Sequence, residues 1–276
     1  LMAQHLDDQA ETVLFRLLRG AGVSGLRGIP AQRALSVGQL LRPLLGISHQ
    51  DLQGYAQQQG LQWIEDPSNA SDGFARNYLR QQIIPRLQTR WPALRSTLQR
   101  TAQHMQEAQQ LLDELAELDL EHAQQQAPLA WLHLPSLDLS VVRDLSLVRQ
   151  KNLLRYWLAA FTLPPDSAHW QSWQTLRDAK SAANPLWRLQ QGALLRSQNT
   201  VYWLPEKYLV EPPVLNLTIS CAGHYQLPEN GCLIVSGEVK APLQISYRQG
   251  AERLLIAGRG HRDLKRLLQE QGIPAF

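Results

Sequence analysis

The sequence has few cysteines, no long apolar run and no recognisable metal motif. Its 276 residues include only Cys221 and Cys232, too few for a disulfide framework or a cysteine-rich zinc site. No apolar run approaches the roughly 18 residues that a membrane-spanning helix needs. The histidines are scattered, and apart from His5 none stands near acids at a metal-ligand spacing. These shortages favour a protein of the reducing cytoplasm, with no membrane partner and no structural metal.

Several common signatures of phosphate-binding and hydrolytic sites are also missing. The residues contain no Walker-type phosphate loop, no GxGxxG, no HExxH and no GxSxG. The composition nevertheless suits a folded protein, with 44% hydrophobic and 18% charged residues. The length predicts more than one domain. The net charge of +3 is compatible with a nucleic-acid partner without requiring one.

Residues 5–30 carry the densest set of signals. Asp8 is expected to cap a helix, with Glu11 completing a capping box, and Gly20 and Gly22 are expected to end it. One apolar stripe follows the helical period: Ala10, Val13, Leu14, Leu17 and Leu18. The simplest interpretation is a well-capped, partly buried helix.

A cap, however, does not need His5 and a second acid, Asp7, in the same turn. A helix N-terminus carries exposed N–H groups and partial positive charge, so it favours anions. A histidine with several carboxylates at this position could serve a cationic substrate, a magnesium ion or a nucleotide.

The next segments suggest the closing part of an α/β domain. Residues 40–45 are expected to be extended, and Ser48 is expected to cap a helix that Gly60 ends. Asp66 precedes a proline in a predicted loop, which leads into a helix. Arg76 and Arg80 share a face of that helix, either as a solvated basic face or as a clamp for phosphate.

The middle of the chain is predicted to be mainly helical. Helices are expected over about 91–126, 145–161 and 168–179, the last capped by Asp166 or Ser167. The tryptophans of this region are expected in a core rather than stacked on bases: Trp157, Trp170, Trp173 and Trp187.

After Leu186 the spacing of the apolar residues changes from the helical period to the alternation that is typical of strands. Residues 187–195 and 200–204 are expected to form a hairpin around 197–199. Short strands are expected at 215–219, 233–236 and 243–247, with Asn230-Gly231 as a turn. Residues 253–271 form a basic segment. It is interpreted either as the solvated face of a helix or as a surface that contacts a phosphate backbone. Its cations are Arg259, His261, Arg262, Lys265 and Arg266.

Taken together, the motifs at residues 4–12 (QHLDDQAET) and 17–22 (LLRGAG) resemble the HHxDDQxET…LLRGxG signature of the tRNA(Ile)-lysidine synthetase family. Residues 66–69 (DPSN), 76–77 (RN) and 84–87 (IPRL) are similar to a second segment of that family, at a similar separation. Residues 250–274 resemble its C-terminal domain. The ordered set is more specific than any one motif.

The resemblance implies a multidomain fold of α/β, α and α+β parts. Residues 1–88 would be the C-terminal part of an ATP pyrophosphatase domain of the adenine-nucleotide α-hydrolase type. Residues 89–210 would be a mainly helical tRNA-binding domain that ends in a β-hairpin, and 211–276 a truncated α+β tRNA-binding domain.

The family's reaction uses ATP and Mg²⁺ to join free L-lysine to C2 of the wobble cytidine of a tRNA(Ile) with a CAU anticodon. The resemblance implies a cytoplasmic ligase, with a homodimer as a further option. It also implies roles for particular residues. The catalytic set is His5, Asp7, Asp8, Glu11 and Arg76, with Asp8 as the Mg²⁺ ligand. The substrate-binding set is Asp66, Asn69, Asn77 and Arg80. The tRNA-binding set is Arg259, Arg262, Lys265 and Arg266.

Two departures from the family pattern qualify these expectations. Gln4 stands where the family often has a histidine, and the family's SGGxDS pyrophosphate loop is absent from these residues. We expect that loop upstream of Leu1, and we expect the 276 residues alone not to turn over ATP. The alternatives are a different ATP pyrophosphatase, such as a tRNA thiolase, or a non-catalytic tRNA-binding module.

Overall fold

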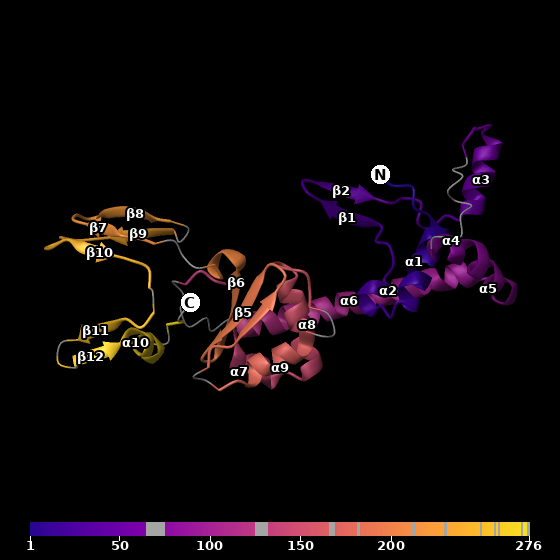
Figure 1. Ribbon diagram of the computed structural model, residues 1–276. Helices are drawn as coiled ribbons and strands as arrows, with labels where there is room; N and C mark the ends of the chain where they lie inside the picture. The colour runs from indigo at the N-terminus through magenta and orange to yellow at the C-terminus, as the bar shows by residue number, and fades with distance from the viewer. Residues whose placement is uncertain are drawn as a thin grey trace. The chain divides into compact units, whose positions relative to one another are not determined.

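The computed structural model in Figure 1 describes the chain in two compact units, Leu1–Glu114 and Leu115–Phe276. It describes all residues except 65–74, 125–131, 166–168, 181–182, 211–213, 229–230, 249, 257, 259, 272 and 275–276. The long helix α6 (Leu94–Gln124) begins in the first unit and ends in the second. The domain boundaries expected at 88 and 210 stay a prediction.

The first unit is mainly helical, with one hairpin. Its elements are α1 (Leu6–Leu18), α2 (Val23–Leu26), β1 (Gln32–Leu35), β2 (Gly38–Leu41), α3 (His49–Gln58), α4 (Ala75–Tyr78), a π-helix (Leu79–Ile83), α5 (Ile84–Arg90) and the start of α6. As expected, Ser48 caps α3 by accepting a hydrogen bond from the Asp51 N–H at 3.1 Å.

The extended run expected at residues 40–45 ends at Leu41, so most of that prediction was wrong. β2 pairs only with β1, as an antiparallel hairpin. Arg42 then bonds back to the chain before β1: its N–H donates to the Ala31 carbonyl at 2.8 Å and its guanidinium to the Pro30 carbonyl at 2.9 Å. Residues 43–46 then form turns rather than a strand.

Helix α1 begins three residues earlier than the capping prediction. His5 is its N-cap, and Asp8, at the third helical position, accepts the His5 backbone N–H at 3.0 Å. The prediction of Asp8 as N-cap was therefore wrong. Asp8 instead occupies the N3 position of the capping box, where its carboxylate accepts the backbone N–H of the N-cap residue. The apolar stripe is buried only in its first half: Ala10 and Val13 are buried, whereas Leu17 and Leu18 are exposed.

The glycine-rich connector after α1 folds back onto that helix. The Gln9 side chain accepts the Ile29 N–H at 2.6 Å and donates to the Ile29 carbonyl at 3.3 Å. Arg16 donates to the carbonyls of Gly25 and Gly28, at 2.8 and 2.9 Å. Two polar side chains of α1 thus form hydrogen bonds with backbone groups of this connector, which includes the short helix α2.

Replacing Gly28 with alanine is expected to destabilise the protein by about 1–3 kcal/mol, the usual cost of a strained backbone position. Gly28 has a φ of 68°, and a Cβ there would lie 2.5 Å from the Gln9 amide oxygen. Urea denaturation of the variant measures the loss. Gly46→Ala is the control, because a Cβ at Gly46 meets no atom within 4 Å. Equal stability of the two variants would show that neither the positive φ of Gly28 nor its closeness to the Gln9 side chain affects stability.

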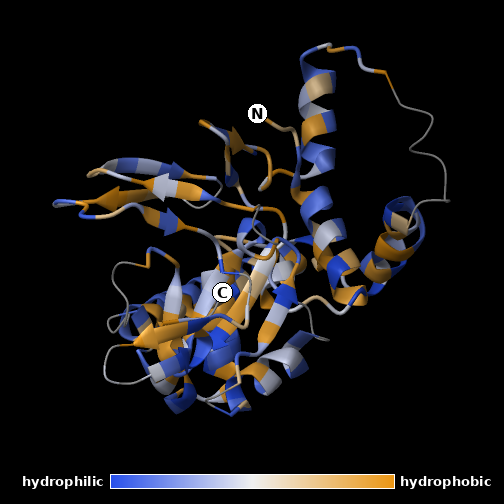
Figure 2. Ribbon diagram, turned by 60° about the vertical axis from the view of Figure 1, so that its left-hand side comes forward, coloured by the Kyte–Doolittle hydropathy of each residue, from blue (hydrophilic) through white to orange (hydrophobic). Residues whose placement is uncertain are grey.

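The second unit begins with the end of α6 and contains a four-stranded antiparallel sheet with strand order β3-β6-β5-β4. Its elements are β3 (Ser136–Asp138), α7 (Leu139–Asp144), α8 (Leu147–Leu158), α9 (Trp170–Asp178), β4 (Leu186–Leu189), β5 (Gly192–Ser197) and β6 (Thr200–Pro205). In Figure 2, apolar and polar residues alternate along the helices and strands, as expected of elements buried on one face. The predicted hairpin is confirmed, since Ser197 pairs with Thr200 across Gln198 and Asn199.

The core of the second unit contains the tryptophans, as the sequence indicated. Trp157, Trp170, Trp173 and Trp187 are each at most 6% exposed. Trp173 donates its indole N–H to the buried side chain of Gln150 at 3.1 Å. The expected first strand, 187–195, is split into β4 and β5, because a turn begins after Leu189.

A buried arginine closes the end of helix α9. The Arg196 guanidinium, on β5, donates to the carbonyls of Leu176, Arg177 and Ala179, at 3.2, 2.9 and 2.5 Å. These carbonyls have no helical partner, so the cation satisfies them and complements the helix dipole. Burial lowers the pKa of Arg196, with the nearby Arg143 adding to the effect.

The last part of the chain forms short antiparallel pairs. They are β7 (Leu217–Ile219) with β10 (Leu243–Ile245), β8 (Gly223–Leu227) with β9 (Gly231–Val235), and β11 (Arg253–Ile256) with β12 (Gly260–Asp263), followed by α10 (Leu264–Glu270). The basic segment at 253–271 consists of a hairpin followed by a helix: Gly260 has a φ of 67°, β11 pairs with β12, and α10 begins at Leu264. Over the described ranges, no helix combines the length and apolar character needed to cross a bilayer.

Candidate functional site

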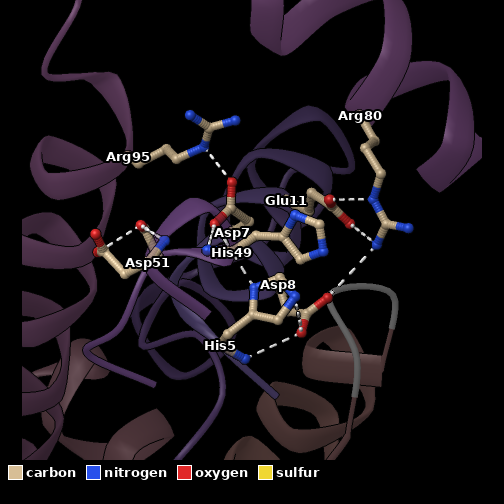
Figure 3. A network of polar contacts seen from close by, with 9 residues as sticks. His5, Asp7, Asp8, Glu11, His49, Asp51, Arg80 and Arg95 are labelled. Carbon is tan, nitrogen blue, oxygen red and sulfur yellow. Dashed lines mark hydrogen bonds and ion pairs between the residues drawn. The ribbon is translucent and has the colours of Figure 1, made fainter. Parts of the chain in front are cut away.

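The side chains of the first two turns of α1 form a polar network with three other helical segments (Figure 3). His5, Asp7, Asp8 and Glu11 come from α1 and its cap. Their partners come from α3, the π-helix and α6: His49, Arg80 and Arg95. Residues that lie far apart in the sequence therefore meet at the N-terminal end of one helix.

Glu11 is the most buried carboxylate of this network, and it forms an ion pair with Arg80. Arg80 donates from Nε to Glu11 Oε1 at 2.6 Å and from Nη2 to Oε2 at 2.9 Å. The Glu11 side chain is 3% exposed, whereas that of Arg80 is 43% exposed. The hydrogen bond to Glu11 raises the pKa of Arg80, so this guanidinium stays charged. Glu11 is held in one orientation by a forked donor.

Asp8 lies between Arg80 and His5. Its Oδ1 is 3.5 Å from Arg80 Nη2, and its Oδ2 is 3.5 Å from His5 Nε2. The Asp8 side chain is 24% exposed, compared with 3% for Glu11. Among the three acids of α1, Asp8 therefore has the carboxylate most accessible to solvent and to a substrate.

Asp7 is held by residues that sequence reasoning missed. Its Oδ2 accepts the His49 backbone N–H at 2.8 Å, and its Oδ1 forms an ion pair with Arg95 Nε. The His5 and His49 rings lie 5.2 Å apart between centroids. The Ser48 cap already indicated that His49 opens a helix, but no local signal connects Arg95 with a residue so distant in the chain.

The other predicted catalytic and substrate-binding residues lie beside the network or outside the described residues. Arg76, on α4, is exposed and donates to the Thr12 hydroxyl on α1 at 3.4 Å, so it lies beside the network. Asn77 is partly buried on the same helix. Asp66 and Asn69 lie outside the described residues. Arg80 was predicted to bind substrate, and here it contacts Glu11 and Asp8.

The predicted tRNA-binding residues belong to the second unit. Arg262 lies on β12, and Lys265 and Arg266 lie on α10, all with exposed side chains. Arg266 is 3.4 Å from Glu270, one turn along the same helix. Arg259 lies outside the part of the chain that the structure describes.

The described side chains do not by themselves form a magnesium site. Within the described ranges, no group of three or more His, Cys, Asp or Glu side chains is arranged to hold a metal ion. Asp7 and Glu11 are taken up by guanidinium partners. Mg²⁺ is usually held by one or two protein carboxylates together with substrate phosphates and waters, so these side chains form at most part of its site.

Comparison with known protein families matches three parts of the chain. Residues 1–87 match a PP-loop domain, 137–202 the TilS substrate binding domain, and 243–276 the TilS substrate C-terminal domain. These matches confirm the predicted order of an ATP pyrophosphatase-type domain, a substrate-binding domain and a C-terminal domain.

Curated relatives are similar over the whole chain. It is 52% identical to a tRNA(Ile)-lysidine synthase of Pseudomonas syringae pv. tomato, over 100% of this chain and 62% of that protein. It is 53% identical to the Pseudomonas putida enzyme over 99% of this chain and 64% of that protein. It is 36% identical to a tRNA(Ile)-lysidine synthase of Methylococcus capsulatus, over 99% of this chain and 64% of that protein. The chain thus spans less than two thirds of the length of these relatives.

Proposed function

Because this chain belongs, over the part that it spans, to the tRNA(Ile)-lysidine synthase family, we propose that the complete protein joins L-lysine to the wobble cytidine of the CAU-anticodon tRNA(Ile). The observation that carries this proposal is the charge of the α1 network. Asp7, Asp8 and Glu11 supply three negative charges, and Arg80 and Arg95 neutralise two of them. Asp8 has only a 3.5 Å contact with the guanidinium that Glu11 already engages, so its carboxylate suits a substrate that carries an ammonium group.

The proposed reaction has two steps. The O2 atom of the cytidine attacks the α-phosphate of ATP, and diphosphate leaves. The ε-amine of lysine then attacks C2, the C2–O2 bond breaks, AMP leaves and the amine loses a proton. The first step is necessary because the cytidine carbonyl oxygen is a poor leaving group until it is adenylated.

The residues of the network suit particular parts of this reaction. Asp8, the more accessible acid, would bind the lysine ammonium group beside Glu11, which Arg80 holds in place. His5, 3.5 Å from Asp8, would orient the amine or accept its proton. Arg76 would stabilise the phosphate charge that develops as AMP leaves. We derive no step through Mg²⁺, and Asp8 as its ligand stays a prediction.

The second unit would hold the tRNA. Arg262, Lys265 and Arg266 are exposed cations on neighbouring elements, as expected of contacts to a phosphate backbone. Such contacts strengthen binding without selecting a sequence, and they weaken steeply with salt. A cytoplasmic location and a homodimer remain predictions from the family resemblance.

Lysidine formation tests the proposed function directly. With ATP, labelled lysine and CAU-anticodon tRNA(Ile), the complete protein is expected to produce labelled tRNA and AMP. Asp8→Asn is expected to lower the rate by about 100-fold or more, because it removes a charge placed for the reaction. Glu107→Gln is the control, since Glu107 is an exposed carboxylate on α6.

Two outcomes would contradict the proposal. Full activity of Asp8→Asn would remove Asp8 from the site. Absence of lysidine, together with equal and salt-sensitive binding of tRNA(Ile) and another tRNA, would favour a general tRNA-binding module instead.

A further inference from the structure

Arg95 contacts the site from a helix to which no site role was assigned. It lies in the first turn of α6, and its Nε forms an ion pair with Asp7 Oδ1. On the other side of the carboxylate, Asp7 Oδ2 accepts the His49 N–H at 2.8 Å. The Asp7 side chain is 14% exposed, so both its oxygens lie largely inside the protein with partners from two other helices.

The position of Asp7 bears on the predicted site residue His5. Asp7 Oδ2 is 3.6 Å from His5 Nδ1, a buried atom without a hydrogen-bond partner among the described residues. The other ring nitrogen of His5 is 3.5 Å from Asp8 Oδ2. The contacts therefore form a series from Arg95 through Asp7 and His5 to Asp8, which Figure 3 shows.

We propose that Arg95 is a positioning residue: it holds Asp7 in the orientation in which Asp7 directs the His5 ring toward Asp8. This inference rests on the proposed function, because it gives Arg95 a part in the transfer of the amine. Arg95 touches no reacting atom in the proposed reaction.

The exposure of the pair indicates a geometric role rather than a large contribution to stability. The Arg95 side chain is 37% exposed and that of Asp7 is 14% exposed, compared with 3% for Glu11, and an ion pair between two partly exposed groups contributes less to stability. A displacement of about 1 Å in a group that orients a reacting centre can nevertheless slow a reaction by about 100-fold. The expected signature is a slower reaction in a protein that stays folded.

Arg95→Gln and Arg95→Lys in the complete protein test the inference, with Arg100→Gln as the control. Arg100 is exposed on the same helix. Arg95→Gln is expected to lower kcat for lysidine formation by about 10- to 100-fold, with Arg95→Lys in between and the control unchanged. The KM for tRNA and its salt dependence are expected to stay the same.

A double-mutant cycle with Asp7→Asn identifies the route of the effect. If Arg95 acts through Asp7, Arg95→Gln lowers kcat by less than about twofold once Asp7 is asparagine. Multiplicative losses would overturn the inference, as would unchanged kcat in both Arg95 variants. A salt-dependent rise in the KM for tRNA would instead assign Arg95 to a phosphate contact. If the unsubstituted protein forms no lysidine, the proposed function itself fails.

Discussion

In the complete protein, Arg80→Gln is expected to lower the free energy of unfolding by about 2–3 kcal/mol and, under the proposed function, to abolish measurable lysidine formation. The substitution leaves the carboxylate of Glu11, 3% exposed, without its guanidinium partner. Removing one member of a buried ion pair typically costs about 3–5 kcal/mol, and the expected loss is smaller here because Arg80 is 43% exposed to solvent. Urea denaturation measures the stability, and Arg90→Gln, at an exposed position on α5, is the control.

The second substitution Glu11→Gln separates the two effects of Arg80. In the Arg80→Gln background it removes the unpaired charge, so most of the lost stability is expected to return. Activity is expected to stay absent, because the site then lacks both groups. If Glu11→Gln does not restore stability, the loss comes from another contact of Arg80, such as that with Asp8 at 3.5 Å.

Trp173→Ala is expected to cost about 3–5 kcal/mol, the usual range for removing a buried tryptophan side chain. Trp173 is 1% exposed in the core of the second unit, and its indole N–H donates to Gln150. Loss of far-UV circular dichroism on heating measures the change in Tm. Val148→Ala is the control, because Val148 is 76% exposed on the neighbouring helix α8.

Trp173→Phe keeps the prediction testable if the alanine variant does not fold. It retains most of the buried ring and loses one hydrogen bond, so a loss of about 1–2 kcal/mol is expected. Gln150 keeps a partner, because Arg177 Nη1 also donates to its side-chain oxygen, at 3.2 Å. Equal stability of Trp173→Phe and the unsubstituted protein would show that this hydrogen bond contributes nothing.

Local patterns in the sequence were sufficient for the helices and for the hairpin of the second unit. Three features depend on residues that are close in the sequence, so the sequence predicts them: the cap at Ser48, the helical spacing of apolar residues along α6, and the turn at Gln198. The start of α1 was misplaced because Asp8 is a favoured N-cap residue whereas His5, the N-cap in the structure, is not. Only the backbone shows that Asp8 accepts the His5 N–H.

The sequence alone determined the family, the acidic turn of α1 and the buried place of the tryptophans, because short motifs and periodicity carry that information. The tertiary structure decided the partners of the acids. Arg80 neutralises Glu11 and Arg95 pairs with Asp7 because folding brings the π-helix and α6 to the N-terminal end of α1. Contacts between residues so far apart in the chain depend on the packing of whole helices, and no local pattern specifies them.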